Sequence, residues 1–344
     1  MSAQAEGFVD THHHAMLPEY VTALGKIGVT DGGGVPFPHW DAQSDLALMD
    51  RHGIAAAVLS VAAPGVFFDD IGLARRLARQ CNEALAQTVR AHPSRFGALA
   101  VLPLPDTEAA LDELAHALDV LKLDGVCLLT NVGGRYLGDP LFDPLMAELD
   151  RRHMTVFVHP HEPPASPQAR LRLRAALLEY LLDTTRAVAN LMVSGCLECY
   201  PNVSFILSHG GGAVPAHAWR LALGLEAKEM PLRDNVAHAA EQVTHTYNRD
   251  VLDEGQRGLE LLRTRFFYDV ALSATPFALA ALQALVGPGR ILFGSDVPFA
   301  PEFIVAETVR GLANHGRFDE AGRRAVARDN ALKLFPGLAA RMSR

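Results

Sequence analysis

Two histidines near the start of the chain, His12 and His14, have the type and spacing of metal ligands. They end the run Gly7-Phe-Val-Asp-Thr-His-His-His, whose apolar beginning is typical of a β-strand. Side chains at positions i and i+2 of a strand point to the same side, so both imidazoles can reach one ion while His13 faces elsewhere. The pair supplies half of a metal site.

Three more residues with metal-binding or proton-transferring side chains directly follow hydrophobic runs of strand type: His159, His209 and Asp296. Parallel-barrel enzymes place their reactive groups at the carboxyl ends of strands. Three imidazoles and one carboxylate suit a borderline divalent cation such as Zn²⁺, with one position open for water or substrate. Repetition of this placement at four strand ends therefore predicts metal-assisted chemistry.

Each of these downstream residues also has a structural interpretation. His209 could simply bond to the glycine turn that follows it, and Asp296 could cap the next helix. Asp10 shares its strand parity with His12 and His14, so it could orient a ligand histidine from the layer below or be a structural acid.

These side chains can meet only in a fold that brings distant strand ends together. The sequence indicates such a fold, because an apolar strand followed by an amphipathic helix repeats along the chain. Strands are predicted at 7–12, 54–61, 96–102, 123–130, 154–159, 203–208, 266–272 and 290–294. Helices are predicted near 41–52, 71–92, 106–121, 140–152, 168–200, 212–228, 250–263, 275–286, 301–314 and 318–332.

This alternation predicts an α/β fold, a distorted (β/α)8 barrel of the TIM type, as a single domain over residues 1–344. An open doubly wound sheet is the alternative, but no glycine-rich phosphate fingerprint follows the first strand. The insertion at 15–40 carries glycine and proline clusters, which predict a long loop without regular structure. Such a loop at a barrel's carboxyl end is expected to act as a substrate lid.

Composition limits the partners. A net charge of −8 and a pI near 6.0, without a basic cluster, argue against nucleic acid and anionic membranes. No apolar run approaches the ~20 residues that cross a bilayer. Residues 1–6 lack the features of a signal peptide, so we expect a cytoplasmic protein. Cys196-Leu-Glu-Cys199 lacks a second pair, which favours core packing over zinc or redox duty.

The motifs resemble those of the metal-dependent amidohydrolase superfamily, and more narrowly its branch related to aminocarboxymuconate semialdehyde decarboxylase. The motifs that carry this resemblance are Asp10-x-His12-x-His14, Val158-His159-Pro160, Ser208-His209-Gly-Gly-Gly212 and Phe293-Gly-Ser-Asp296-x-Pro298. Within the branch, 6-methylsalicylate decarboxylases are most similar, through Leu129-Thr-Asn131, Tyr136-Leu-Gly-Asp139, Asp183-Thr-Thr-Arg186-Ala187 and Tyr268-Asp269.

The resemblance implies one divalent ion, Zn²⁺ with Mn²⁺ as the alternative, held by His12, His14, His159 and Asp296. It leaves His209 as an acid or base, and either His209 or Asp296 as the proton donor.

Substrate contacts are expected from Asn131 after the fourth strand and from Trp40 and Phe299, which could form an apolar lid. Arg186 is either a carboxylate clamp or the ion-pair partner of Asp183. Arg220 matches a family arginine that reaches a neighbouring subunit's site, which implies a homodimer.

The stretch Trp40-Asp-Ala-Gln-Ser-Asp45 has no arginine where the semialdehyde decarboxylases carry one, which favours a monocarboxylate such as a salicylate. We therefore expect a non-oxidative decarboxylase of an ortho-hydroxylated aromatic acid. Hydrolysis of a lactone, ester or amide at the same site is the alternative, although Lys122 precedes the fourth strand and no lysine follows a strand as bimetallic hydrolases require. A third hypothesis is a metal-stabilised binding protein without catalysis. It does not explain why four strand ends carry residues with reactive side chains.

Overall fold

Eight strands form the centre of the molecule, and every neighbouring pair among them is parallel. The computed structural model describes residues 7–163, 171–225 and 250–344. In spatial order the strands are β1 (Phe8–His14), β4 (Ile54–Ser60), β5 (Phe96–Val101), β6 (Gly125–Leu129), β9 (Thr155–His159), β10 (Ser204–Leu207), β11 (Phe266–Asp269) and β12 (Ile291–Leu292).

The segment after the last strand joins the first strand, which closes the sheet into a barrel. The amide of Thr11 donates to the carbonyl of Phe293 at 3.0 Å, and the amide of Asp296 donates to the carbonyl of His12 at 2.8 Å. The barrel prediction is therefore confirmed, and all eight predicted strands are present; an open doubly wound sheet is excluded because its edge strands would stay unpaired.

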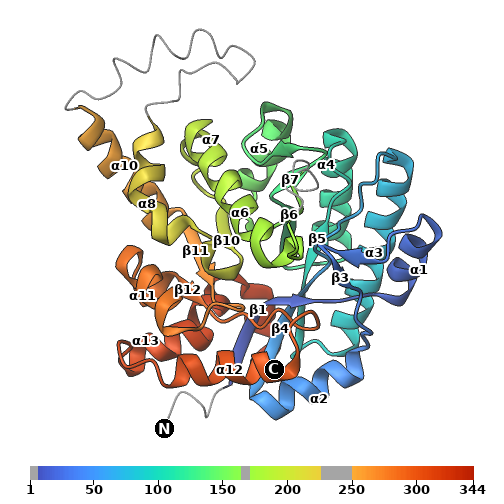
Figure 1. The fold of residues 1–344 in the computed structure, drawn as a ribbon. Coiled ribbons are helices and arrows are strands. Elements are labelled where there is room, and N and C mark those ends of the chain that lie inside the picture. The colour runs from blue at the N-terminus through green and yellow to red at the C-terminus, as the bar shows by residue number, and fades with distance from the viewer. Residues whose placement is uncertain (1–6, 164–170, 226–249) are drawn as a thin grey trace.

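Helices surround the barrel (Figure 1). They are α1 (Pro18–Lys26), α2 (Ala42–His52), α3 (Ile71–Ala91), α4 (Thr107–Ala115), α5 (Asp143–Arg151), α6 (Ala175–Val193), α7 (Cys196–Cys199), α8 (Val214–Ala222), α10 (Asp250–Thr264), α11 (Pro276–Leu285), α12 (Glu302–Ala313), α13 (Glu320–Arg324), α14 (Asn330–Leu334) and α15 (Pro336–Met342). Two short hairpins, β2 (Asp31–Gly32) with β3 (Val35–Pro36) and β7 (Asn131–Val132) with β8 (Arg135–Tyr136), extend from its carboxyl-end loops.

The barrel interior is filled at its amino-terminal end by the last helices of the chain. Phe335, between α14 and α15, and Leu338, on α15, are fully buried among inward-facing strand residues such as Val9 and Leu99. Thr155, at the start of β9, donates its hydroxyl to the carbonyl of Leu334 at 2.9 Å. Because this end is closed by side chains, the carboxyl end of the barrel is the one available for chemistry.

The prediction that residues 15–40 lack regular structure is wrong. They contain α1 and the hairpin β2–β3. Pro18 occupies the first turn, where its missing amide costs nothing, and Tyr20 and Leu24 lie four residues apart on one buried face. The glycine and proline clusters thus mark the ends of short elements.

Several predicted helices differ from the structure, and the one expected at 106–121 is α4 followed by a π-helical turn over His116–Val120. The helix expected at 168–200 is divided into α6 and α7 by Ser194–Gly195, a break typical of glycine near a helix end. Its first residues, and the end of the helix expected at 212–228, lie outside the described residues. The long helix at 318–332 becomes α13, a π-helical turn over Ala325–Asp329 and α14.

Two expectations from composition can be compared with the structure. In the described part of the chain no helix combines the length and apolarity needed to span a membrane. Cys196 and Cys199 are both free thiols, but only Cys196 is buried; Cys199 is exposed, so the prediction of core packing holds for Cys196 and is wrong for Cys199.

Candidate metal centre

Three imidazoles and one carboxylate converge at the carboxyl end of the barrel. His12, His14, His159 and Asp296 each offer one ligand atom, and these atoms lie within 4.8 Å of one another. The Nε2 atoms of His12 and His14 are 3.1 Å apart, and Oδ1 of Asp296 lies 3.2 and 3.1 Å from them. Tetrahedral ligands about 2.0–2.1 Å from Zn²⁺ stand roughly 3.3 Å apart. The donor set and its spacing fit one divalent ion.

Each imidazole of the cluster has a hydrogen-bond partner at Nδ1, and for His12 and His159 this partner fixes the protonation. Nδ1 of His12 lies 2.8 Å from Oδ2 of Asp269, and Nδ1 of His159 lies 2.8 Å from the carbonyl oxygen of Pro160. A carboxylate or carbonyl oxygen only accepts, so Nδ1 carries the proton and Nε2 keeps its lone pair. Nδ1 of His14 bonds to the Ser60 hydroxyl at 2.8 Å. Such partners orient imidazoles for metal binding.

Electrostatics make the cluster a cation site. Burial lowers the pKa of His14 to about 4 and also lowers the pKa of His159. Burial opposes the charged form of His12 as well, but the carboxylates of Asp269 and Asp296 outweigh it and raise the pKa of His12 to about 10. Despite burial, hydrogen bonds from His12 and His14 hold the pKa of Asp296 well below its usual range. The carboxylates of Asp269 and Asp296 therefore favour positive charge at this position.

Asp296 and His209 both have backbone conformations that are rare for residues with a side chain. Their φ angles are +65° and +53°, in the left-handed region. Asp296 does not cap the next helix, because α12 begins at Glu302 and Pro301 precedes it. After His209, a Cβ at Gly212 would lie 2.2 Å from the carbonyl oxygen of Leu181, so only glycine fits there. Strained backbone of this kind is common at functional sites.

His209 lies against the cluster, with its ring centroid 4.7 Å from that of His12. Its Nδ1 faces the carbonyl oxygen of Ala271 at 3.4 Å, and its backbone amide donates to Oδ1 of Asp269 at 3.0 Å. Because Nδ1 donates to a carbonyl, Nε2 is the ring nitrogen left to exchange a proton with a bound molecule. Burial lowers the pKa of His209.

Phe299 and Trp40, both expected as lid residues, occupy different environments. Phe299 lies beside the metal cluster, with its ring centroid 5.6 Å from that of His14. Trp40 is buried, and its indole N–H donates to Oδ2 of Asp45 at 2.9 Å. Phe299 is therefore positioned to contact a molecule bound at the cluster, whereas Trp40 anchors Asp45.

Two of the other predicted substrate residues, Asn131 and Arg186, lie around a second buried carboxylate, Asp183. Asn131 donates its side-chain amide to Asp183 at 2.9 Å, and the Tyr136 hydroxyl donates to it at 2.5 Å. Arg186 is 3.9 Å from Asp183, which is the ion-pair alternative stated above. Arg220 is exposed on α8.

Asp10 does not orient a ligand imidazole. Its Oδ2 lies 2.9 Å from Nδ1 of His13, whose Nε2 lies 2.9 Å from Asp45. The pairing of β1 with β4 is irregular between Asp10 and His13, and this break in alternation turns Asp10 to the side of His13. Burial opposes the charge on His13, but Asp45 and Asp10 raise its pKa to about 10. The prediction that His13 faces away from the cluster is confirmed.

Asp269 was missed as a functional residue in the sequence, although it ends β11 and so carries the same strand-end signal as the others. Its two oxygens serve His12 on one side and the amides of His209 and Ala271 on the other. Asp269 therefore links the metal cluster to the candidate acid.

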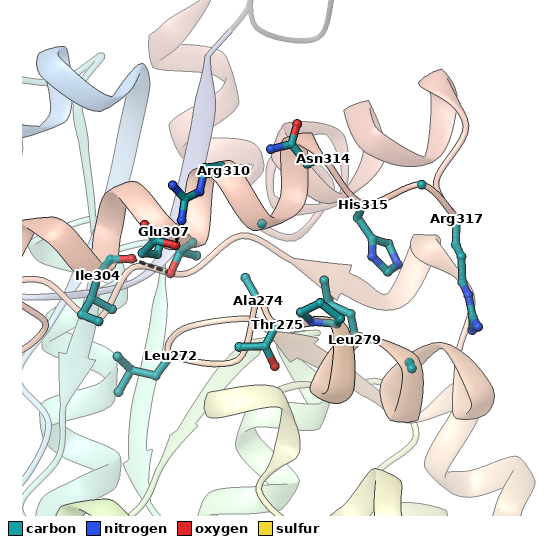
Figure 2. A pocket seen from close by; sticks show the side chains of 15 residues that line it. Leu272, Ala274, Thr275, Leu279, Ile304, Glu307, Arg310, Asn314, His315 and Arg317 are labelled. Carbon is teal, nitrogen blue, oxygen red and sulfur yellow. Dashed lines mark hydrogen bonds and ion pairs between the residues drawn. The ribbon is translucent and has the colours of Figure 1, made fainter.

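A cavity of about 690 Å³ lies between the loop after β11, α11 and α12. Leu272, Thr275 and Leu279 line one side of it and Ile304, Glu307 and Arg310 the other (Figure 2). None of its lining residues belongs to the metal cluster, so its volume does not identify the site.

The fold and the four-residue cluster are those of a metal-dependent hydrolase-type barrel, and the chain belongs to the amidohydrolase family, which matches residues 9–337. It is similar to the 6-methylsalicylic acid decarboxylase of Penicillium expansum, with 34% identity over 334 residues covering 96% of each chain. Among solved structures it is similar to 2,6-dihydroxybenzoate decarboxylase from Rhizobium, at 25% identity and a TM-score of 0.75 over 96% of this chain and 99% of that one.

The fold is also that of 5-carboxyvanillate decarboxylase from Novosphingobium aromaticivorans, which was solved with manganese and a nitrobenzoic acid. That protein is 22% identical, with a TM-score of 0.79 over 97% of each chain. The family resemblance stated from the motifs is confirmed.

Proposed function

We propose that the protein is a carboxy-lyase, a metal-dependent non-oxidative decarboxylase of an ortho-hydroxylated aromatic acid similar to 6-methylsalicylate. The observation that carries this proposal is a cluster for one metal ion with a buried histidine, His209, against it. The similarity to named decarboxylases over nearly the whole chain supports the same reaction.

The ligands in this proposal are His12, His14, His159 and Asp296, holding one divalent ion. Zn²⁺ is proposed from the donor set, with Mn²⁺ as the alternative. When bound, the ion would supply positive charge that holds the substrate's carboxylate and ortho oxygen together and fixes the ring.

The reaction adds a proton to the ring carbon that bears the carboxylate and then breaks the bond from that carbon to CO₂. His209 and Asp296 are the two proposed donors of this proton. His209 has Nε2 available, since Nδ1 is engaged by Ala271. Both groups must first take up a proton, because His12 and His14 hold Asp296 ionised and the ring proton of His209 lies on Nδ1, which leaves Nε2 without one.

Substrate contacts are proposed for Phe299 directly, and for Asn131 and Arg186 through the Asp183 cluster that they share. Trp40 would act by supporting this end of the barrel, since its N–H is already bonded to Asp45. We also propose a cytoplasmic homodimer in which Arg220 reaches the neighbouring subunit's substrate.

The decisive experiment is anaerobic incubation of the metal-loaded protein with a panel of salicylates and catecholic acids, recording CO₂ and the phenol formed. We expect one phenol per CO₂, and no product from protein stripped of metal with a chelator. Hydrolysis of lactones, esters or amides with every salicylate left unchanged would replace this proposal with the hydrolase alternative.

A further inference from the structure

The strand ends around the barrel mouth differ in polarity from one side to the other. The strands from β9 through β12 to β1 carry the histidines and aspartates described above. The remaining arc, β4, β5 and β6, lies between β1 and β9 in the closed order of strands. There β5 and β6 end at Val101 and Leu129, and β4 ends at Ser60, which Val61 follows. Apart from Ser60, the strand ends on this side of the mouth are therefore apolar.

A cavity of about 50 Å³ lies in this apolar arc, and most of its lining is aliphatic. Val101, Cys127 and Leu129 come from strand ends, and Val61 and Val66 come from the loop after β4. Cys127 also packs in the core inside the barrel, and Leu129 shares its parity, so this wall faces inward.

Two residues that line the cavity lie next to a metal ligand or to its hydrogen-bond partner. Val61 follows Ser60, whose hydroxyl bonds Nδ1 of His14. Leu129 is the register partner of His159 on the neighbouring strand. A molecule that reaches the ion from the barrel mouth therefore has this cavity at its flank.

The loop over the cavity is fixed in place. The Tyr20 hydroxyl donates to the carbonyl of Gly65 at 2.5 Å. A Cβ at Gly65 would lie 2.6 Å from Cδ1 of Leu129, so the loop backbone packs directly on that side chain. The cavity is thus bounded by anchored structure and has a defined size.

The cavity favours a small, uncharged and mainly apolar occupant. Burial raises the pKa of Cys127 to about 12, so its thiol is neutral, and Asn131 directs its amide to Asp183. Nδ1 of His161 is a buried polar atom without a partner among the described residues. A volume of 50 Å³ exceeds the roughly 10–15 Å³ that one water-sized group needs, but it has no room for a second ring.

We infer that this cavity is a substrate subsite for a small alkyl group on the aromatic ring, at the position next to the carboxylate and away from the ortho oxygen. The inference rests on the proposed function, because a ring held at the metal by its carboxylate and ortho oxygen leaves only that neighbouring position close to the ion. Val101, Cys127 and Leu129 would then determine specificity by excluding charge and limiting the size of the group.

The test compares 6-methylsalicylate, salicylate and 2,6-dihydroxybenzoate as substrates of the metal-loaded protein. One carbon in an apolar pocket is worth roughly 10- to 200-fold, so we expect kcat/KM for the methylated acid to exceed that for salicylate by about this factor. Val101→Phe should fill the cavity and bring the ratio of kcat/KM for 6-methylsalicylate to that for salicylate close to one. Val101→Ala should enlarge it and raise the relative rate of 6-ethylsalicylate, which keeps the test valid if the phenylalanine variant does not fold.

Val89→Ala is the matched control, because Val89 is a similarly buried valine on α3 away from the cavity, and it should leave the ratio unchanged. Calorimetric binding of 3-methyl-2-nitrophenol against 2-nitrophenol measures the same preference without turnover, since a nitro group cannot leave as CO₂. A binding preference that Val101→Phe abolishes, with no decarboxylation of any acid, would keep the subsite and reject the proposed reaction.

A ratio unchanged in both Val101 variants would overturn the subsite. A preference for the hydroxylated acid over the methylated one would overturn its alkyl character and point to a hydrogen bond with His161.

Discussion

Replacing Asp269 by asparagine should weaken metal binding although Asp269 is not itself a ligand. Its Oδ1 accepts from the amides of His209 at 3.0 Å and Ala271 at 2.9 Å, so the asparagine carbonyl would stay on that side. The asparagine NH₂ would then face Nδ1 of His12, where Oδ2 now accepts at 2.8 Å. His12 could accept this hydrogen only by moving its own proton to Nε2, the atom that must bind the ion.

The expected loss follows from the role of such supporting groups. Removing a hydrogen-bond partner of a metal-bound histidine typically lowers metal affinity by 10- to 100-fold, or about 1.4 to 2.7 kcal/mol. The tautomer change places Asp269→Asn near the upper end of that range. Competition with a chromophoric zinc chelator measures the affinity directly, and Tm of the metal-free protein reports any general loss of stability.

Asp45→Asn is the matched control, since Asp45 is a buried carboxylate that contacts His13 and Trp40 instead of a ligand imidazole. Its metal affinity should stay within about threefold of the unchanged protein. Equal affinity of the Asp269→Asn and unchanged proteins, or an equal loss in Asp45→Asn, would refute the tautomer argument.

Four further outcomes are expected. His209→Asn should lower turnover by roughly 10²- to 10⁴-fold with metal content preserved, whereas Asp296→Asn should lower both; the opposite pattern of metal content would exchange their roles. The pKa of His13 is raised from 6.5 to about 10, so its charge stabilises the fold fully below pH 6.5 and this contribution is lost as pH rises toward 10. Tm should therefore fall less steeply over that range in His13→Gln, and parallel curves would contradict this. Burial raises the pKa of three thiols to about 12 while Cys199 is exposed, so a thiol reagent should modify about one cysteine per native chain and four after unfolding. Mixing inactive Asp296→Asn and Arg220→Ala chains should restore some activity if the subunits share sites, and a monomer mass by light scattering would exclude this.

The sequence was most informative where residue type and element type coincide. His12 and His14 stand on a strand with a period of two, and His159 and Asp296 follow apolar runs, so parallel strands bring them together without knowledge of any loop.

Other features depend on contacts that local patterns do not encode. Strict alternation placed Asp10 beneath the ligand histidines, but a single irregularity in the pairing of β1 moved it to His13. The large apolar side chain of Trp40 suggested a lid residue. Its indole N–H instead donates a tertiary hydrogen bond to Asp45, which holds that carboxylate in place. Asp269 showed the strand-end signal, but its importance comes from a partner 257 residues away.

Strand β1 carries two side-chain networks in seven consecutive buried residues. His12 and His14 belong to one network, and Asp10 and His13 belong to the other. A substitution here damages one network, but loss or gain of a single residue would exchange the sides of the strand and present His13 to the ion. Insertions or deletions should consequently be tolerated in connections such as residues 27–30, between α1 and β2. Within β1 they should abolish metal binding.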